Sequence, residues 1–284
     1  MGAYGLWGLL PIYFKLLHEI APMEIVSQRI LWSLVLILTI LMVRGNIPAL
    51  LAVLSRPHLA LPLTASAILI CSNWLLYVWT VNNNHVIAAS FAYFLGPLIN
   101  VAFGVLILKE RLRRTQLLAI GTAATGVMIM AGTALTTLWI SVALALTFAL
   151  YGLIRKLTPV APMVGLGAET LLLLPFAVAY MGWLAHHGGL NIGKDGVTTL
   201  LLIAAGAVTT IPLVLFAMAA QKLPMATLGL LQYIAPTLLF LCGVLLYGEV
   251  LSQGQILSFA LIWAGLILFA ADSIAAARRN DVAA

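Results

Sequence analysis

Long apolar runs constrain this chain more than any other feature. A helix that crosses the hydrocarbon core of a bilayer needs about 20 apolar residues, and ten runs approach or exceed that length. The chain is 63% hydrophobic and 8% charged with a mean hydropathy of +1.13, so it has too little polar surface to cover a soluble globule of 284 residues. The runs are continuous and not alternating, which predicts an all-α integral membrane protein.

The ten runs define ten predicted transmembrane helices. The first begins almost at Met1 with no basic residue before it, so we expect a short natural amino-terminal segment to be missing. No A-x-A site follows that run, so we expect no cleavable signal peptide. The predicted helices cover Gly2–Leu17, Met23–Val43, Leu59–Val81, Ile87–Leu108, Thr115–Thr133, Leu138–Ile154, Pro162–Leu184, Val197–Ala220, Met225–Tyr247 and Gln253–Ser273.

The chain repeats a pattern at a distance of 139 residues. At that shift Pro97 falls on Pro236 and Glu110 falls on Glu249, so each half carries an apolar run with an early proline and a closing glutamate. We therefore predict two five-helix repeats, the first at 1–134 and the second at 135–284. A membrane protein built from two repeats most often encloses a substrate path between them.

The basic residues gather in alternate loops, with 11 on one side and 3 on the other. Because short cytoplasmic loops carry the excess of Lys and Arg, we predict a protein of the inner or plasma membrane with both chain ends in the cytoplasm. An odd number of spans per repeat then inverts the second repeat relative to the first. The more basic side holds Arg44, Arg56, Lys109, Arg111, Arg113, Arg114, Arg155, Lys156, Lys222, Arg278 and Arg279, and the other holds Lys15, Arg29 and Lys194.

Two charged residues lie several positions inside predicted spans, and a shift of 140 residues sets Arg29 against Glu169. A charge at the middle of a bilayer costs about 2.5 to 3.5 kcal/mol on insertion scales, so such a side chain normally faces protein or a watery cavity. Glu169 is either a hydrogen-bonded core residue or a substrate or proton site, and proton coupling through Glu169 is a separate hypothesis. Arg29 either lines a substrate path or extends to the outer interface.

The third predicted span is unusually polar for a membrane helix. Asn73, Tyr77 and Thr80 share one face at helical spacing, with Trp74 beside them. A lipid-facing Asn would leave its amide without partners, so this face points inward, either to join helices or to line a pathway. Comparable faces carry Tyr93, Pro97 and Asn100 on the fourth span and Gln232, Tyr233 and Pro236 on the ninth.

The residues that match between the repeats suggest mechanical roles. Pro97 and Pro236 predict matched bends at a hinge, and the alternative is that they only shape a static bundle. Glu110 and Glu249 do not form a catalytic pair, because inversion places them on opposite membrane faces. We expect each to accept hydrogen bonds from exposed N–H groups where one span ends and the next begins.

No catalytic or metal-binding pattern is present in the sequence. Cys71 and Cys242 lie inside apolar runs without CxxC or Cys/His spacing. The histidines form no HExxH motif, and no Walker-type glycine loop exists for ATP. No basic stripe with interleaved aromatics indicates nucleic acid. We therefore expect no enzymatic activity, cofactor, metal or nucleic-acid partner, and we expect a small-molecule substrate and the lipid bilayer as partners.

Several motifs together resemble the drug/metabolite transporter superfamily with its duplicated EamA-type domain, and within it the RarD-type permeases. They are GLWGLLPIYFK from Gly5, RILWS from Arg29, NWLLYVWTVNNNHV from Asn73, YFLGPLINVAFGVLILKERL from Tyr93, YGLIRKL from Tyr151, ETLLLLP from Glu169 and LGLLQYIAPTLLFLCGVLLYGE from Leu228. The resemblance covers nearly the whole chain. It implies a ten-helix inner-membrane permease with a central cavity between inverted halves, and it lends no catalytic residue.

The leading hypothesis is a secondary transporter of small organic metabolites or drugs that works by alternating access. The alternatives are a membrane enzyme for lipid-like substrates, which would need carboxylates or histidines clustered at one membrane face, and a non-transporting sensor or assembly subunit. Aromatic walls would stack on the substrate and polar groups would orient it. The predicted cavity residues are Trp7, Tyr13, Arg29, Asn73, Trp74, Tyr77, Tyr93, Glu169, Gln232 and Tyr233.

Overall fold

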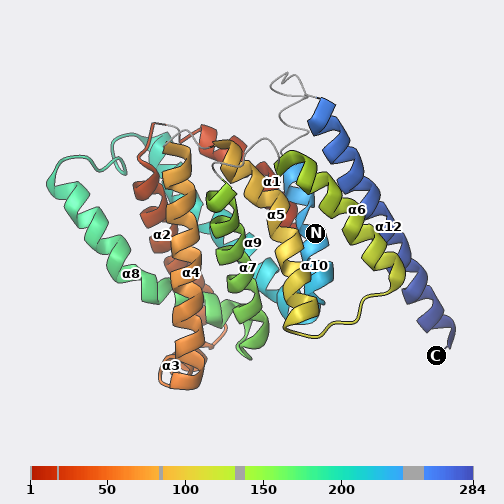
Figure 1. Ribbon diagram of the computed structural model, residues 1–284. Helices are drawn as coiled ribbons and strands as arrows, with labels where there is room; N and C mark the ends of the chain where they lie inside the picture. Colours follow the sequence, from red (N-terminus) through yellow and green to blue (C-terminus); the bar gives the residue numbers. More distant parts are fainter. Residues whose placement is uncertain (1, 18, 83–85, 132–137, 239–252, 284) are drawn as a thin grey trace. The chain divides into compact units, whose positions relative to one another are not determined.

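The computed structural model describes residues 2–17, 19–82, 86–131, 138–238 and 253–283. Within these segments the regular elements are helices and no strand occurs (Figure 1). The predicted all-helical fold class is thus confirmed. Helices follow from the apolar runs, because a backbone in lipid must satisfy its polar groups within its own segment.

Most helices begin and end within three residues of the predicted spans. Proline starts several of them, since its missing N–H costs nothing at the first helical position. The described helices are α1 Gly2–Lys15, α2 Pro22–Val43, α3 Ile47–Leu54, α4 Pro57–Asn82, α5 Val86–Leu106, α6 Arg114–Ala131, α7 Leu138–Leu157, α8 Pro162–His186, α9 Gly196–Lys222, α10 Met225–Gln232 and α12 Gln253–Ala283.

The structure also differs from the predicted spans. The short helix α3 lies where a loop was expected, α7 continues past Ile154 and α12 continues to Ala283. The ninth span is interrupted after Gln232, where α10 ends. Pro236 explains this interruption, because it has no N–H to donate to the carbonyl of Gln232, four residues earlier.

The chain forms two compact units that do not follow the order of the sequence. Unit 1 comprises Met1–Asn84 and Leu146–Leu223, and unit 2 comprises His85–Ala145 and Pro224–Ala284. Each unit therefore combines segments from both predicted repeats. The division at 134/135 describes the repeat in the sequence and stays a prediction.

In unit 1, helix α2 packs against α8 and α9, and α8 also packs against α4. Gly206 brings α9 close to α2, because a Cβ at this position would lie only 2.5 Å from the backbone carbonyl carbon of Trp32. The Ser33 hydroxyl donates to the carbonyl of Gly206 at 3.2 Å. These contacts fix the register of α2 against α9 and therefore the level at which Arg29 meets α9.

In unit 2, α6 and α12 lie side by side (Figure 1), and α5 packs against α10. Glycines bring α6 and α12 together, because a Cβ on Gly126 would lie 2.7 Å from the carbonyl oxygen of Ser258. A Cβ on Gly265 would lie 2.5 Å from the carbonyl oxygen of Ala119. Small residues at helix contacts are typical of membrane bundles, where backbones approach closely.

Five described helices are long and apolar enough to cross a membrane. Their outer faces carry large apolar side chains such as Phe176, which is 72% exposed. Exposed apolar surface on this scale is what lipid covers. The chain is thus a multi-pass membrane protein. The five segments are Pro22–Val43, Pro57–Tyr77, Leu138–Leu157, Pro162–His186 and Gly196–Lys222, and shorter apolar helices cover Phe91–Leu106, Met225–Leu238 and Ile256–Asp272.

Candidate functional site

Arg29 of α2 is held inside unit 1 by neighbours from two other helices. Its Nε donates to Oγ1 of Thr209 on α9 at 2.8 Å. Its guanidinium carbon lies 4.6 Å from the centre of the Trp74 ring on α4. A cation over the face of a tryptophan is attracted by the ring quadrupole, more strongly where water is excluded. Three helices therefore meet at one half-buried positive charge.

The position of Thr209 shows how deep this charge lies. Helix α9 has 27 residues, from Gly196 to Lys222, and Thr209 is its middle residue. At 1.5 Å per residue, Thr209 is about 20 Å from either end of the helix. Arg29 is therefore directed to the middle of a neighbouring span and does not extend to the outer interface. That it contacts a substrate stays a prediction.

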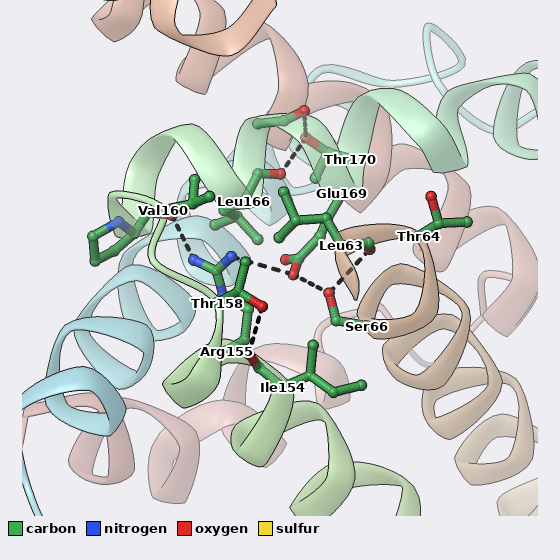
Figure 2. A network of polar contacts seen from close by, with 12 residues as sticks. Leu63, Thr64, Ser66, Ile154, Arg155, Thr158, Val160, Leu166, Glu169 and Thr170 are labelled. Carbon is green, nitrogen blue, oxygen red and sulfur yellow. Dashed lines mark hydrogen bonds and ion pairs between the residues drawn. The ribbon is translucent and has the colours of Figure 1, made fainter. Parts of the chain in front are cut away.

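Glu169 of α8 occupies a second polar site in unit 1, which Figure 2 shows from close by. The hydroxyl of Ser66 on α4 donates to Oε1 of Glu169 at 2.5 Å. Nη1 of Arg155 on α7 lies 3.6 Å from the same Oε1. The side chains of Arg155 and Glu169 are 0% and 1% exposed. Both charges are therefore enclosed by protein, whereas Arg29 is only half-buried.

Arg155 is a buried charged residue that sequence reasoning missed. The predicted place of Arg155 among the basic residues of a loop is wrong, because α7 continues to Leu157 and Arg155 is completely buried. Without Arg155 the basic count on that side falls from 11 to 10, and without Arg29, which lies inside its span, the count on the other side falls from 3 to 2. The reason for the wrong assignment is the neighbouring Lys156, because two adjacent basic residues after an apolar run are typical of a loop.

A glycine makes room for the buried guanidinium. A Cβ on Gly165 of α8 would lie 2.0 Å from Nη1 of Arg155 and 2.6 Å from Nη2. Nη2 donates to the carbonyl of Pro162 at 3.1 Å. Lys156, by contrast, points to the end of α9 and donates to the carbonyls of Ala220 and Leu223. The two adjacent basic residues of α7 therefore serve different neighbours.

The other predicted cavity residues of unit 1 also have partners. Trp7 packs edge-on against Phe148 with ring centres 5.5 Å apart, and the Tyr13 hydroxyl donates to the carbonyl of Leu201 at 2.6 Å. Nδ2 of Asn73 donates to Oγ1 of Thr147 at 2.9 Å, which joins α4 to α7. The contact of Asn73 supports the interpretation that it joins helices. Tyr77 is half-buried on the same helix.

Unit 2 holds Tyr93, Gln232 and Tyr233. Oε1 of Gln232 accepts from Nδ2 of Asn100 at 2.7 Å, and the Tyr233 hydroxyl donates to the carbonyl of Phe94 at 3.1 Å. Gln232 and Tyr233 are both buried, and Tyr93 is half-buried. The predicted cavity residues are thus divided between the two units, and their role in a substrate cavity stays a prediction.

The two prolines predicted as a hinge have different surroundings within unit 2. Pro97 lies inside the continuous helix α5. Pro236 follows the interruption of the ninth span, four residues after α10 ends at Gln232. A Cβ on Gly229 would lie 2.6 Å from the Pro97 carbonyl oxygen, so α10 approaches α5 closely at this point. Hinge motion at these prolines stays a prediction.

Glu110 has the structural role that was expected of it. Its Oε1 accepts from the backbone N–H of Met225 at 2.7 Å, and its Oε2 accepts from that of Ala226 at 3.1 Å. A carboxylate at this position satisfies two free N–H groups and the positive end of the helix dipole. The helix it caps is α10, far along the chain, and not the next span. Glu249 and Cys242 lie outside the described residues.

A cavity of about 330 Å³ lies beside Glu110 in unit 2. Its lining includes Arg111, Arg113 and Phe269 and none of the predicted substrate residues. Arg113 is also paired with Asp272 through its Nη2 at 2.5 Å. Among the residues that the structure describes, no group of three or more His, Cys, Asp or Glu could hold a metal ion.

A buried carboxylate near the start of α2 also escaped sequence reasoning. Glu24 is 0% exposed, and its two oxygens accept from the backbone N–H and Nδ2 of Asn191 at 2.8 and 2.7 Å. Asn191 lies in the connection between α8 and α9 and accepts from Nζ of Lys194 at 3.0 Å. Glu24 therefore holds this loop, and its place in the first turn of a helix gave no sign of it.

The comparisons with known proteins agree with these membrane helices. The model of the EamA-like transporter family matches residues 1–132. An uncharacterized transporter of Pseudomonas aeruginosa is 44% identical to this chain, over 98% of this chain and 93% of the relative. The protein RarD of Salmonella typhi is 41% identical, over 99% of this chain and 96% of the relative. The chain belongs to the RarD-like drug/metabolite transporters.

A solved structure supports the fold of this RarD-like chain. One crystal structure superposes with a TM-score of 0.74 over 94% of both chains, with 18% sequence identity. At that identity the likeness concerns the fold alone. The family resemblance expected from the sequence motifs is confirmed, and a membrane transporter is the function that these relatives support.

Proposed function

We propose that this RarD-like protein is a secondary transporter of small organic metabolites or drugs in the inner membrane. It would work by alternating access through a cavity between two inverted five-helix repeats, with ten spans and both termini in the cytoplasm. One observation carries the proposal. The half-buried guanidinium of Arg29 on α2 contacts Thr209 at the middle of α9 and lies on the face of Trp74. A charge at that depth normally faces protein or a watery cavity and marks a substrate pathway.

Contacts within unit 1 support the repeat. Helices α2 and α8 correspond to the second spans of the two predicted repeats, and α4 and α9 correspond to the third spans. Helix α2 packs against α9, and α8 packs against α4. In each pair a charged residue of the second span meets a hydroxyl of the third, Arg29 with Thr209 and Glu169 with Ser66. Repeat-related contacts of this kind are typical of inverted-repeat transporters.

The chemistry around Arg29 suits an organic molecule with an aromatic or anionic part. Trp74 offers a flat apolar surface for stacking, and a guanidinium offers several N–H donors and a positive charge for a carboxylate or a carbonyl group. In a ligand site that is mostly apolar, a small number of polar groups fixes the orientation of the ligand.

A flux assay tests the proposal. Purified protein in lipid vesicles is given a panel of anionic, neutral and cationic metabolites, and transport by wild type is compared with Arg29→Ala. Arg44→Ala is the matched control, because Arg44 follows the end of the same helix and is exposed. We expect Arg29→Ala to lower kcat/KM at least about tenfold, which corresponds to about 1.4 kcal/mol, and Arg44→Ala to leave it unchanged.

Two results would contradict the proposal. Equal rates for wild type and Arg29→Ala on every transported compound would place the substrate path elsewhere in the protein. The lack of protein-dependent flux with any compound would favour a non-transporting membrane subunit instead.

A further inference from the structure

The site around Glu169 contains three buried polar atoms without partners among the described residues. They are Nε and Nη1 of Arg155 and Oε2 of Glu169. The distance of 3.6 Å between Nη1 and Oε1 is too long for a direct hydrogen bond. A buried ion pair normally stabilises a protein only when further hydrogen bonds satisfy the remaining donors and acceptors. Arg155 can therefore donate further hydrogen bonds, and Glu169 can accept a further one.

Ser66 can serve Glu169 in either protonation state. Its Oγ lies 2.5 Å from Oε1 of Glu169 and 3.0 Å from the carbonyl oxygen of Leu63, but a hydroxyl has only one proton to donate. When Glu169 is ionised, Ser66 donates to the carboxylate. When Glu169 carries a proton, that proton can be donated to Oγ and Ser66 can donate to Leu63. Both oxygen contacts are then hydrogen bonds (Figure 2).

Few other groups compete for a proton at this place. Helix α7 contributes Arg155 and the Tyr151 hydroxyl, which also interacts with the carboxyl group as a hydrogen-bond donor, and α4 contributes Ser66. From α2 and α3, apolar side chains approach the neighbouring Gly167, namely Ile37, Leu41 and Leu50. Glu169 is therefore the group of this site that we expect to gain and lose a proton.

We propose that Glu169 and Arg155 form an enclosed proton-binding site. One proton adds to the carboxylate oxygen Oε1, which faces the Ser66 hydroxyl, an O–H bond forms, and the net charge of the pair rises from zero to +1. The same proton leaves from the same oxygen in the reverse step. No other reactant is needed, because the only exchange is between Glu169 and water that enters the site.

Protonation has a mechanical consequence. A neutral Glu169 no longer balances the buried guanidinium, and an unpaired buried charge costs several kcal/mol, so Arg155 must move toward water or toward a new acceptor. Gly165 and the Pro162 carbonyl surround the guanidinium where the connection between α7 and α8 ends. This connection is therefore the expected route for both the proton and the moving side chain. Proton uptake would thus loosen the contact between α7 and α8.

The use of this site to drive transport rests on the proposed function, whereas proton binding itself does not. The test therefore needs no substrate. Full-length protein in lipid is titrated while infrared difference spectra record the carbonyl stretch of protonated carboxyl groups. Wild type is compared with Glu169→Gln, so that the difference between their spectra belongs to Glu169 alone.

Two variants remove the counter-charge in different ways. Arg155→Gln deletes it, and Gly165→Ala displaces it, because the added Cβ overlaps the guanidinium. Gly182→Ala is the matched control on the same helix, since nothing lies within 4 Å of its Cβ position. We expect a Glu169 band that appears on acidification in wild type, shifts to higher pH in both variants and is unchanged in Gly182→Ala.

The outcomes separate the two proposals. A Glu169 band that does not change over the pH range in which the protein is folded would overturn the proton site, and so would a band whose midpoint is the same in wild type, Arg155→Gln and Gly165→Ala. If Arg155→Gln does not fold, Gly165→Ala alone decides. A titrating band together with no flux for any compound would retain the proton site and remove the transport function. Flux whose dependence on a proton gradient persists in Glu169→Gln would contradict coupling through this residue.

Discussion

The sites of Arg29 and Glu169 occupy related positions in the two predicted repeats. They differ in how the protein stabilises a charge inside the membrane. Arg29 is half-buried and is held by Thr209 and the face of Trp74. Glu169 is enclosed, accepts from Ser66 and has an opposite charge beside it in Arg155. The hydroxyl partner is common to both sites, and enclosure with a counter-ion is the difference.

This difference suggests separate roles for the two charged residues, with substrate recognition at Arg29 and proton binding at Glu169. A half-buried guanidinium can exchange a water molecule for a ligand at little cost, so the Arg29 site suits substrate recognition. A charge that is 1% exposed cannot meet a substrate without a rearrangement, so the Glu169 site suits a proton. The comparison predicts that the enclosed site dominates stability and the half-buried site dominates affinity.

The largest effect is expected from removing one partner of the enclosed pair. Arg155→Met should lower the free energy of unfolding by about 3 to 5 kcal/mol, because it leaves Glu169 buried without a counter-charge. Unfolding of detergent-solubilised protein at mildly alkaline pH measures this loss. The double variant Arg155→Met with Glu169→Gln removes both charges and should recover most of it. If the single and double variants are equally unstable, the pair is not what holds α7 against α8.

The sequence predicted the Glu169 site only in part. A glutamate inside an apolar run is conspicuous, so Glu169 could be selected, and the apolar runs located α8 and α4. Its partners could not be selected. Arg155 stands beside Lys156 at the end of a run, and Ser66 is one of several hydroxyl residues in its span. Which of them faces Glu169 depends on the register between helices that are far apart in the sequence.

The two hydroxyls offer a matched test of enclosure. Ser66→Ala should destabilise the protein by about 1.5 to 3 kcal/mol, because a buried hydrogen bond to a charged group is lost. Thr209→Val should cost only about 0.5 to 1.5 kcal/mol, since Thr209 is buried but its partner Arg29 is half-buried and can turn its guanidinium to another acceptor. The free energies of unfolding of both variants are measured under one condition. Equal losses would show that enclosure does not distinguish the sites.

Trp74 should contribute mainly to the Arg29 site. Trp74→Leu keeps an apolar side chain but removes the ring face under the guanidinium, which should cost about 0.5 to 2 kcal/mol. We expect this loss to appear as a higher KM in vesicle flux, with Trp183→Leu as control, since Trp183 is 55% exposed near the end of α8. A change in unfolding free energy without a change in KM would instead make Trp74 a packing residue.

The remaining predicted cavity residues show why contacts cannot be inferred from periodicity. Asn73 was expected on an inward face and is there, but its amide bonds Thr147 on another helix. Gln232 also shared a predicted polar face, and it is buried against Asn100. A helical period places a side chain on a face of its own helix. It does not show whether that face meets a cavity or a neighbouring helix.

The smallest effect is expected at Asp195, an exposed carboxylate that also accepts a short hydrogen bond. It precedes α9, and the backbone N–H of Thr198 donates to Oδ1 at 2.7 Å. This hydrogen bond lowers the pKa of Asp195 below its ordinary value of 3.8. Because the pKa is lower in the folded protein, the stabilisation is fully present above the unfolded value and is lost as the pH falls through the folded one. Wild type should therefore lose slightly more stability in acid than Asp195→Asn, which keeps an N-cap that does not titrate.

A comparison of Asp195 with Glu169 distinguishes the effect of a hydrogen bond from the effect of burial. It accepts from a backbone N–H much as Glu169 accepts from Ser66, but it is exposed to water. If enclosure controls proton exchange at Glu169, then Asp195→Asn should leave the Glu169 carbonyl band and its pH midpoint unchanged. The unfolding transitions of wild type and Asp195→Asn should differ only in strongly acidic buffer. A difference that persists at neutral pH would mean that the start of α9 is held by the charge of Asp195 and not by its hydrogen bond alone.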